Sequence, residues 1–220
     1  MVDTRHEYDR VAGLYLPIAV GVVVVIVGLV IAFALRYRTR EGVTRPASRL
    51  SSAPKTEAAF VLALAAVAAL LLWRTFSVEA RVDRGASGAP VQVDVTAAKW
   101  HWRFDYPQYG IAQRGTDRRP PTLVVPAGTR VGFTLRSVDV IHAFWIPSLR
   151  FKRDATPGLT TTFSMTFGTP GFTRDGGECS EYCGLDHAFM RFDVRVLPAA
   201  AFARWAAARR AAAGAAGARP

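Results

Sequence analysis

Four side chains that commonly bind soft metals lie within twelve residues of one another toward the C-terminal end of the sequence. They are Cys179, Cys183, His187 and Met190, at successive spacings of four, four and three residues. Thiolate and thioether ligands favour copper, and a methionine beside cysteine and histidine is typical of copper electron-transfer sites rather than of zinc sites. Gly184 gives the intervening backbone freedom to turn. The segment therefore predicts a copper-binding loop.

A disulfide between the same two cysteines is the structural alternative. Cys179 and Cys183 are the two cysteines of the sequence, and paired thiols in an oxidising compartment commonly form a disulfide. The chain has three methionines and four histidines, so finding one of each at loop spacings after the cysteines favours a metal. One donor is still missing, and His142, at the expected end of a strand, could supply it. A lone histidine beside apolar residues is otherwise usually structural.

Two apolar runs near the N-terminus could anchor the chain in a membrane. The first begins at Leu14 and is 22 residues long, which spans a hydrocarbon core of roughly 30 Å at about 1.5 Å per residue. The second begins at Ala58 and continues past Arg74, whose side chain could reach the interface. A signal peptide is the alternative for the first run, and a buried helix for the second. We expect a transmembrane hairpin in residues 1–80, with spans at about 14–36 and 58–78.

Basic residues between the two runs predict the orientation of the hairpin. The connecting segment from Arg36 to Lys55 holds five arginines and one lysine against a single acid, Glu41. Short loops rich in Lys and Arg stay in the cytoplasm. Both termini and everything after residue 80 are then expected on the extracytoplasmic side of a bacterial-type cell membrane, where a thiol persists if it is oxidised, buried or bound to a metal.

Alternation of apolar and polar residues replaces the helical runs from about Val91 onward. Four alternating stretches are separated by proline-glycine breakers, which predicts half-buried strands in a sandwich or small barrel over residues 81–198. The Ala/Arg-rich tail at 199–220 is expected to be a frayed helix or disordered, and we assign it no function. The alternating positions are Val91, Val93 and Val95; Val131, Phe133 and Leu135; Phe163, Met165 and Phe167; and Phe192, Val194 and Val196.

Several classes of function lack their motifs in this sequence. A phosphate-binding glycine loop and a Cys-x-x-Cys-His motif are both absent, so nucleotide chemistry and covalent haem attachment have no support. The formal net charge of +11 could suggest nucleic acid, but an outward-facing anchored domain has no access to it. We expect anionic membrane lipid near the tail instead.

The sequence around His142 and the cysteine loop together resemble subunit II of haem-copper cytochrome c oxidases. The first segment reads Asp-Val-Ile-His-Ala-Phe-Trp-Ile-Pro-Ser-Leu, and about forty residues later the second reads Cys-x-x-x-Cys-x-x-x-His-x-x-Met. The aromatic run at 99–106 and the stretch at 152–158 are also similar, so the resemblance covers nearly the whole chain. It implies an α+β membrane protein, in which the hairpin is followed by an extracytoplasmic all-β cupredoxin-like domain.

The resemblance also implies a binuclear copper A centre. Cys179 and Cys183 would bridge two copper ions. The remaining ligands would be His142, His187, Met190 as a weak ligand of one copper, and the main-chain carbonyl of Glu181 on the other. The Glu181 side chain would reach a magnesium ion shared with subunit I, or else be an ordinary exposed loop carboxylate.

An electron path and a proton path follow from the same resemblance. Trp100 would accept electrons from cytochrome c, and haem in subunit I would receive them for reduction of oxygen to water coupled to proton translocation. Glu57 resembles a glutamate that feeds a proton channel of subunit I, although Phe60 stands where the family commonly has Trp. Trp100 as a packing residue and Glu57 as an ordinary charge at a span end are the alternatives. Subunit III is a further implied partner.

The charge of the outer domain departs from the family pattern, in which surface acids attract a basic cytochrome c. Between Arg81 and Pro220 there are 19 Lys plus Arg and 11 Asp plus Glu, a formal +8, which would steer a basic donor poorly. We therefore expect a cytochrome c that is tethered or held in a supercomplex with quinol:cytochrome c reductase. A local negative patch remains an alternative. Its members would be Asp105, Asp139, Glu178 and Asp186.

Three other functions compete with this interpretation. Nitrous oxide reductase has a similar copper centre, but its large propeller domain does not fit in 220 residues with two spans. A quinol oxidase subunit II keeps the fold and lacks the copper ligands, and a disulfide-stabilised anchored domain could act in assembly or copper delivery. Two spans are too few to enclose a haem pair, so we do not expect the chain to reduce oxygen alone.

Overall fold

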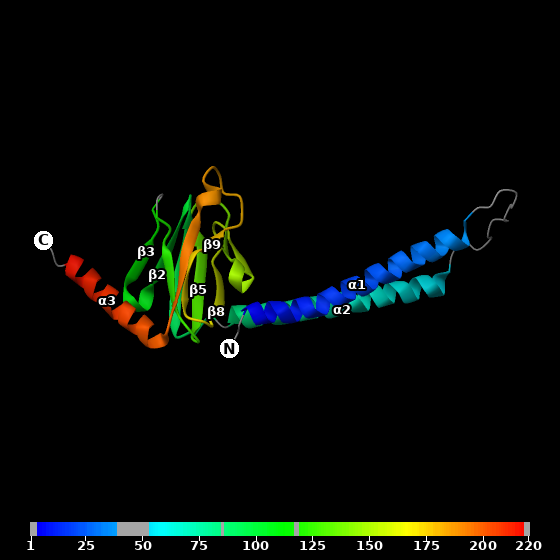
Figure 1. Ribbon diagram of the computed structural model, residues 1–220, viewed down its shortest axis with the longest axis horizontal. Helices are drawn as coiled ribbons and strands as arrows, with labels where there is room; N and C mark the ends of the chain where they lie inside the picture. Colours follow the sequence, from blue (N-terminus) through cyan, green and yellow to red (C-terminus); the bar gives the residue numbers. More distant parts are fainter. Residues whose placement is uncertain (1–3, 39–52, 85, 117–118, 218–220) are drawn as a thin grey trace. The chain divides into compact units, whose positions relative to one another are not determined.

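The computed structural model describes residues 4–38, 53–84, 86–116 and 119–217 (Figure 1). It separates into two compact units. One is Asp9–Ser77, and the other joins Val78–Pro220 to the residues before Asp9. Most of the basic connecting loop that the sequence assigns to the cytoplasm lies outside the described residues.

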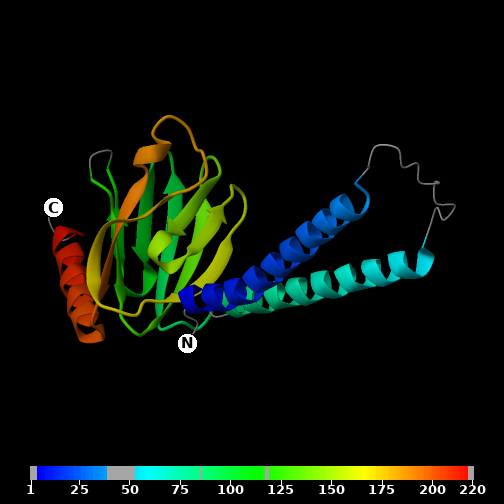
Figure 2. The ribbon, with the colours of Figure 1, turned by 45° about the vertical axis from the view of Figure 1, so that its right-hand side comes forward.

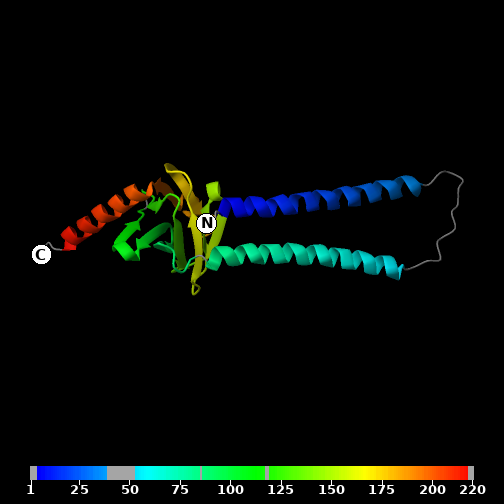
Figure 3. The ribbon, with the colours of Figure 1, turned by 90° about the horizontal axis from the view of Figure 1, so that it is seen from below.

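Two long helices, α1 (Thr4–Arg36) and α2 (Pro54–Arg84), contribute the first unit. Both are long and apolar enough to cross a membrane, and most of their large apolar side chains are exposed, as expected for helices that lipid would cover. Figure 3 shows them side by side, and the Tyr15 hydroxyl lies 2.7 Å from Thr75 Oγ1 between them. The predicted two-helix hairpin is confirmed, and each helix is longer than its predicted span.

Within the described residues, ten strands form two five-stranded sheets, ordered β3-β2-β1-β5-β8 and β4-β10-β9-β6-β7. Figure 2 shows the β domain that they build. Neighbours are antiparallel except for the pairs β1 with β5 and β10 with β4. The strands are β1 (Val91–Ala98), β2 (His101–Tyr106), β3 (Ile111–Arg114), β4 (Thr122–Pro126), β5 (Arg130–Ser137), β6 (His142–Ile146), β7 (Phe151–Ala155), β8 (Thr161–Thr166), β9 (Gly171–Cys179) and β10 (Arg191–Leu197). Short 3-10 helices occur at η1 (Pro107–Tyr109), η2 (Pro147–Leu149) and η3 (His187–Phe189).

An aromatic core fills the space between the two sheets. In β1, buried residues alternate with half-buried ones along the whole strand, so the period-two pattern of the sequence marks the inward face. Phe144 of β6 stacks on Phe192 of β10 with centroids 4.9 Å apart, and Phe133 of β5 stacks on Phe163 of β8 at 5.1 Å. Such pairs contribute about 0.5–1.5 kcal/mol each beyond their buried area. Each of these stacks lies within one sheet, and between the sheets Phe104 of β2 meets Phe192 of β10 edge to face with centroids 5.2 Å apart.

Tyr106, the last residue of β2, joins the two sheets by hydrogen bonds. Its buried hydroxyl donates to the Val124 carbonyl at 2.9 Å and accepts from the Val124 N–H at 2.8 Å, and Val124 belongs to β4 in the other sheet. Burial raises the pKa of Tyr106 well above its usual value, against a smaller lowering by the hydrogen bond to Val124. The hydroxyl therefore stays neutral and satisfies both polar groups of one buried peptide residue.

The C-terminal tail differs from the expectation of a frayed or disordered segment. It forms α3 (Ala199–Gly217), and Phe202 and Ala206 are buried against the β domain. Trp205 meets the ring of Tyr106 edge to face at 5.3 Å. These three side chains recur at helical spacing and give the alanine-rich helix an apolar face, which the sparse composition of the tail obscures.

The last turns of α2, from Val78, pack within the same compact unit as the sheets. Arg153 of β7 reaches Glu79 at 2.9 Å and Asp83 at 2.6 Å. The buried Ser164 hydroxyl of β8 donates to the carbonyl of Val82 at 3.2 Å. The β domain is thus tied to the helix end that leads into it.

Candidate metal centre

Strand pairing brings the distant histidine to the cysteine loop. His142 begins β6 and Cys179 ends β9, and these strands pair antiparallel with Phe144 opposite Cys179. The loop after Cys179 carries the other donors and returns to β10. The Cys179 N–H donates to the Met190 carbonyl at 2.9 Å, which closes the loop at its base. The first and last donors of the loop are therefore held by strand-like backbone contacts.

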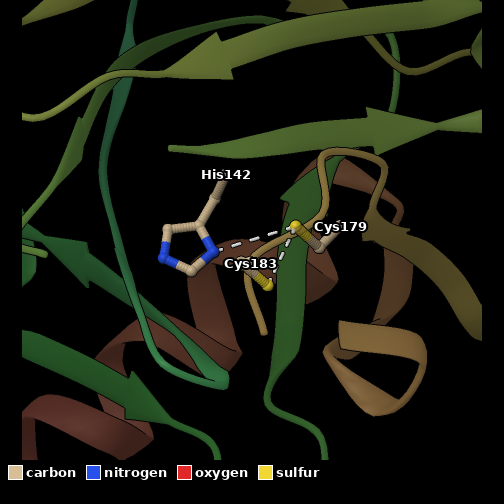
Figure 4. Close-up of side chains that lie close together, drawn as sticks. All are labelled: His142, Cys179 and Cys183. Atoms are coloured by element: carbon tan, nitrogen blue, oxygen red, sulfur yellow. Dashed lines mark hydrogen bonds between the residues drawn. The ribbon is translucent and has the colours of Figure 1, made fainter. Parts of the chain in front are cut away.

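The side-chain donors converge on two thiols (Figure 4). Cys179 Sγ lies 3.9 Å from Cys183 Sγ and 3.8 Å from His142 Nδ1. On the other side, Cys183 Sγ lies 3.6 Å from His187 Nδ1 and 3.9 Å from Met190 Sδ. Both cysteines are free, and with His142 they form a group of candidate metal ligands whose ligand atoms all lie within 4.8 Å of one another.

Glu181 contributes its backbone to this cluster, while its side chain points elsewhere. Its carbonyl oxygen lies 3.2 Å from Cys179 Sγ. Its carboxylate accepts a hydrogen bond from Lys152 Nζ at 2.6 Å, and the side chain is 40 % exposed. The carbonyl expected to bind copper therefore lies beside Cys179, whereas the carboxylate expected to bind magnesium lies beside Lys152.

Most of the donors are shielded from solvent. His142 is fully buried, Cys179, Cys183 and Met190 are buried, and His187 is half-buried. Trp102 shields His142, with ring centroids 6.3 Å apart.

Aromatic residues beside the donors take different parts in this shielding. Phe144 is fully buried next to the site, whereas Phe189 is 78 % exposed and does not cover it.

The two thiols have opposite electrostatic environments. Burial would raise the pKa of Cys179, but hydrogen bonding, first of all to His142, lowers it to about 7. Burial and then the negative charge of Cys179 raise the pKa of Cys183 to about 12. One thiolate therefore forms readily near neutral pH, and the second forms when a cation offsets the charge of the first.

An aspartate that sequence reasoning assigned to the surface bonds the buried histidine. His142 Nε2 lies 2.8 Å from Asp139 Oδ1. Burial would raise the pKa of Asp139, but the Lys99 N–H and His142 lower it. Burial likewise would lower the pKa of His142, but Cys179 and Asp139 raise it. The carboxylate assigns the imidazole proton to Nε2 and leaves Nδ1 with its lone pair toward the thiols.

These donors fit a soft metal such as copper. Two thiols, two imidazole nitrogens, a thioether and a carbonyl oxygen all approach a sulfur atom within 3.2–3.9 Å. Sulfur and imidazole donors are those that copper prefers. A carboxylate bonded to the other ring nitrogen, as Asp139 is to His142, is a usual partner of a metal-binding histidine. Its signal in the sequence is an acid three residues before the histidine.

Trp100 lies directly on the metal loop. Its indole Nε1–H donates to the Cys183 carbonyl at 3.2 Å. Gly184 has a φ of +120°, and a Cβ built there would lie 3.1 Å from the indole ring, so a side chain at this position would meet Trp100. The indole also lines a surface hollow of about 600 Å³ with Lys99, Phe189 and other residues.

Glu57 lies in the first turn of α2, apart from the metal loop in sequence and in compact unit. Its carboxylate accepts a hydrogen bond from the Ala53 N–H at 2.9 Å. Acidic side chains are favoured in this position because they satisfy free N–H groups at the start of a helix. The contact explains the residue as a helix-start feature, and the proton role stays a prediction.

The two packed sheets with a Cys/His/Met loop define a cupredoxin-like domain, and the fold agrees with a known example. The periplasmic domain of subunit II of cytochrome oxidase (CoxB) of Bradyrhizobium japonicum superposes with a TM-score of 0.50 and 28 % identity, over 57 % of this chain and 96 % of that chain. Residues 113–197 match the family model "Cytochrome C oxidase subunit II, periplasmic domain". Over these residues the chain is similar to the cytochrome c oxidase subunit II family.

Curated relatives are similar to the chain in the same way. Cytochrome c oxidase subunit 2 of Bacillus sp. (strain PS3) is 35 % identical over 149 residues, which are 66 % of this chain and 40 % of the relative. Probable cytochrome c oxidase subunit 2 of Mycobacterium leprae is 44 % identical over 87 residues, 38 % of this chain and 25 % of the relative. The chain thus spans less than half the length of these two relatives.

Proposed function

We propose that this chain is the electron-accepting subunit of a haem-copper cytochrome c oxidase and that its metal loop holds a binuclear copper A centre. The convergence of four further donors on two buried thiols carries the proposal. When bound, two copper ions that share the thiolates would take up and release one electron. Cys179 and Cys183 would bridge the ions. The other ligands would be His142, His187, Met190 and the Glu181 carbonyl.

The protein's own part is to hold these donors in one arrangement. The base of the loop is closed by the bond between Cys179 and Met190, and Trp102 covers His142 from the core side. A buried site with fixed ligands changes little when its charge changes, which favours fast electron transfer. Trp100, bonded to the Cys183 carbonyl, would bring the electron from cytochrome c to the loop.

The remaining steps belong to the complex. Electrons would pass from the copper centre to haem in subunit I, where oxygen is reduced to water with proton translocation, and subunit III would be a further partner. The chain would not be catalytic alone. Its β domain and both termini would face the extracytoplasmic side, and Glu57 would lie at the cytoplasmic end of α2, where it could feed protons to subunit I.

A magnesium ion shared with subunit I would need the Glu181 carboxylate. That carboxylate pairs with Lys152, so the ion would have to displace this lysine. Both side chains are partly exposed, which limits the free energy lost when the pair separates.

The electron donor that we propose is a cytochrome c that is tethered or held in a supercomplex with quinol:cytochrome c reductase. Two of the four acids that could attract a free basic cytochrome c have other partners. Asp139 bonds His142 at 2.8 Å, and Asp105 pairs with Arg103 at 2.8 Å. The hollow beside Trp100 is lined by the basic residues Lys99, His101, Arg119 and Arg191 together with the acids Asp175 and Asp186.

Copper quantification and electron paramagnetic resonance on the purified full chain test the proposal. We expect two coppers per chain that share one unpaired electron. Cys183→Ser should abolish that signal, because a hydroxyl cannot replace a bridging thiolate, while Ser180→Ala, a substitution in the same loop at a residue without a ligand role, should retain it. One copper or none in the unmodified chain would refute the proposal.

A further inference from the structure

We propose that Asp139 is a positioning residue that holds the copper ligand His142 with one carboxylate oxygen and the backbone that carries Trp100 with the other. The proposal rests on the copper function proposed above. Asp139 lies in the turn between β5 and β6, three residues before His142. Its side chain is 29 % exposed, whereas the imidazole that it contacts is fully buried.

The first oxygen, Oδ1, faces the copper ligand. It lies 2.8 Å from His142 Nε2 and 2.6 Å from the Val140 backbone nitrogen. The bond to Val140 fixes the carboxylate relative to its own turn, and the Ser137 hydroxyl donates to the Val140 carbonyl from the other side of that turn. The Asp139 carboxylate, fixed by the Val140 N–H, therefore orients the His142 imidazole. The other ring nitrogen, Nδ1, faces Cys179.

The second oxygen, Oδ2, faces the strand turn that carries the indole. It accepts a hydrogen bond from the Lys99 N–H at 2.7 Å, and Lys99 directly precedes Trp100. The Trp100 indole in turn donates to the Cys183 carbonyl. The contacts run from one copper ligand, His142, through Asp139 and Trp100 to another, Cys183. A single side chain thereby links the orientation of a ligand to the place of the electron-accepting indole.

One Asp139 oxygen faces His142 and the other accepts a hydrogen bond from the Lys99 N–H. The isosteric side chain of asparagine cannot make both contacts. Asparagine has one acceptor oxygen and one N–H₂ donor. In Asp139→Asn, one of the two N–H groups, on His142 or on Lys99, must face a donor. The polar contact that is lost leaves a buried or backbone donor unsatisfied, which costs more than the absence of both partners would.

The test compares Asp139→Asn with Asp105→Asn in the full chain loaded with copper. Both variants remove one carboxylate charge, but Asp105 lies on β2 and pairs with Arg103. Loss of a hydrogen-bond partner of a metal-binding histidine, as Asp139 is of His142, lowers metal affinity or activity by about 10–100-fold. We expect Asp139→Asn to weaken copper binding in that range, to speed solvent exchange of the His142 ring N–H in the proton spectrum of the centre, and to slow its reduction by cytochrome c at equal copper content. Asp105→Asn should match the unmodified chain in all three.

A double-mutant cycle with Trp100→Phe shows whether Asp139 and Trp100 act together on the reduction rate or independently of each other. If Asp139 acts on electron acceptance through the indole, its substitution slows reduction less in the Trp100→Phe background than in the unmodified chain. Equal slowing in both backgrounds would overturn the link to Trp100. Unchanged ring N–H exchange, copper affinity and reduction rate in Asp139→Asn would overturn the proposal as a whole.

Separate measurements test whether the variant folds and whether the proposed copper function holds. Should Asp139→Asn fail to fold by circular dichroism, Asp139→Glu keeps both oxygens on a longer arm, and the same exchange and reduction measurements apply to it. A Glu variant with the behaviour of the unmodified chain would overturn the positioning role. Absence of copper from the unmodified chain would instead refute the copper function, so the two failures are distinguishable.

Discussion

At the scale of single residues, the sequence predicts the donors of the site but not the hydrogen bonds that hold these donors in place. The identities and spacing of Cys179, Cys183 and Met190 predict a soft-metal loop because few other residues bind copper. The bond from Asp139 to the Lys99 N–H could not be predicted in the same way, since it depends on how two distant turns meet. The asymmetry between the thiols likewise follows from burial and from the approach of His142, both of which are tertiary properties.

The close approach of Trp100 to the loop backbone makes Gly184 sensitive to substitution. Gly184→Ala would place a Cβ 3.1 Å from the indole at a φ of +120°, and such strain costs about 1–3 kcal/mol. We expect a lower melting temperature and slower reduction of the copper centre by cytochrome c, because the indole must move. Gly168→Ala is the control, since its Cβ would meet nothing within 4 Å. Equal behaviour of the two variants would contradict the packing described for Trp100.

At the scale of elements, period-two alternation predicted the strands and long apolar runs predicted the helices. Burial alternates along the whole of β1, whereas the last four residues of β8 are buried on both faces of the strand. The pairing of β1 with β5 and of β10 with β4 has no local signal, because both are parallel contacts between segments far apart in the chain. The packing of α3 also escaped prediction, since Phe202, Trp205 and Ala206 are few among many alanines.

The bond between Tyr106 and Val124 predicts an effect on stability and its pH dependence. Tyr106→Phe leaves the buried N–H and C=O of Val124 without this partner and should lower the free energy of unfolding by about 1–3 kcal/mol. Because the folded pKa of Tyr106 is raised above the unfolded value of about 10, its contribution is fully present below pH 10 and is lost as pH rises above it.

Denaturant titrations of the full chain at several pH values measure both effects. The unmodified chain should lose stability more steeply above pH 10 than Tyr106→Phe, which has no phenol at that position to ionise. Tyr109→Phe is a matched control, since its ring is half-buried beside Phe202 and it takes no part in the bond between the sheets. Parallel pH curves for Tyr106→Phe and the unmodified chain would show that the hydroxyl does not bear this role.

At the scale of the whole molecule, composition and charge predicted an anchored, outward-facing and basic protein. The two long apolar helices and the similarity to a periplasmic domain agree with the first two properties. The basic character is stronger than the residue count suggests, because two acids that could form a negative patch have partners within the chain. Asp139 bonds His142 and Asp105 pairs with Arg103. Net charge was readable from composition, whereas its distribution needed the fold.

Turnover of the purified oxidase complex with a free basic cytochrome c tests the consequence for docking. We expect slow turnover with weak dependence on ionic strength, because a basic surface does not steer a basic donor and salt then has little attraction to screen. An oxidase from a relative with an acidic docking face serves as the reference. Fast turnover that declines steeply at high salt would contradict the proposal of a tethered or supercomplex-bound donor.

The hydrogen bond between the Cys179 N–H and the Met190 carbonyl has an evolutionary consequence. It joins the two ends of the ligand loop, so β9 and β10 of one sheet can stay paired whatever lies between these residues. Metal binding and fold could then diverge separately. Substitutions in one loop and at the start of one strand would remove the proposed copper site, and a descendant without it could keep the same sandwich for a different use.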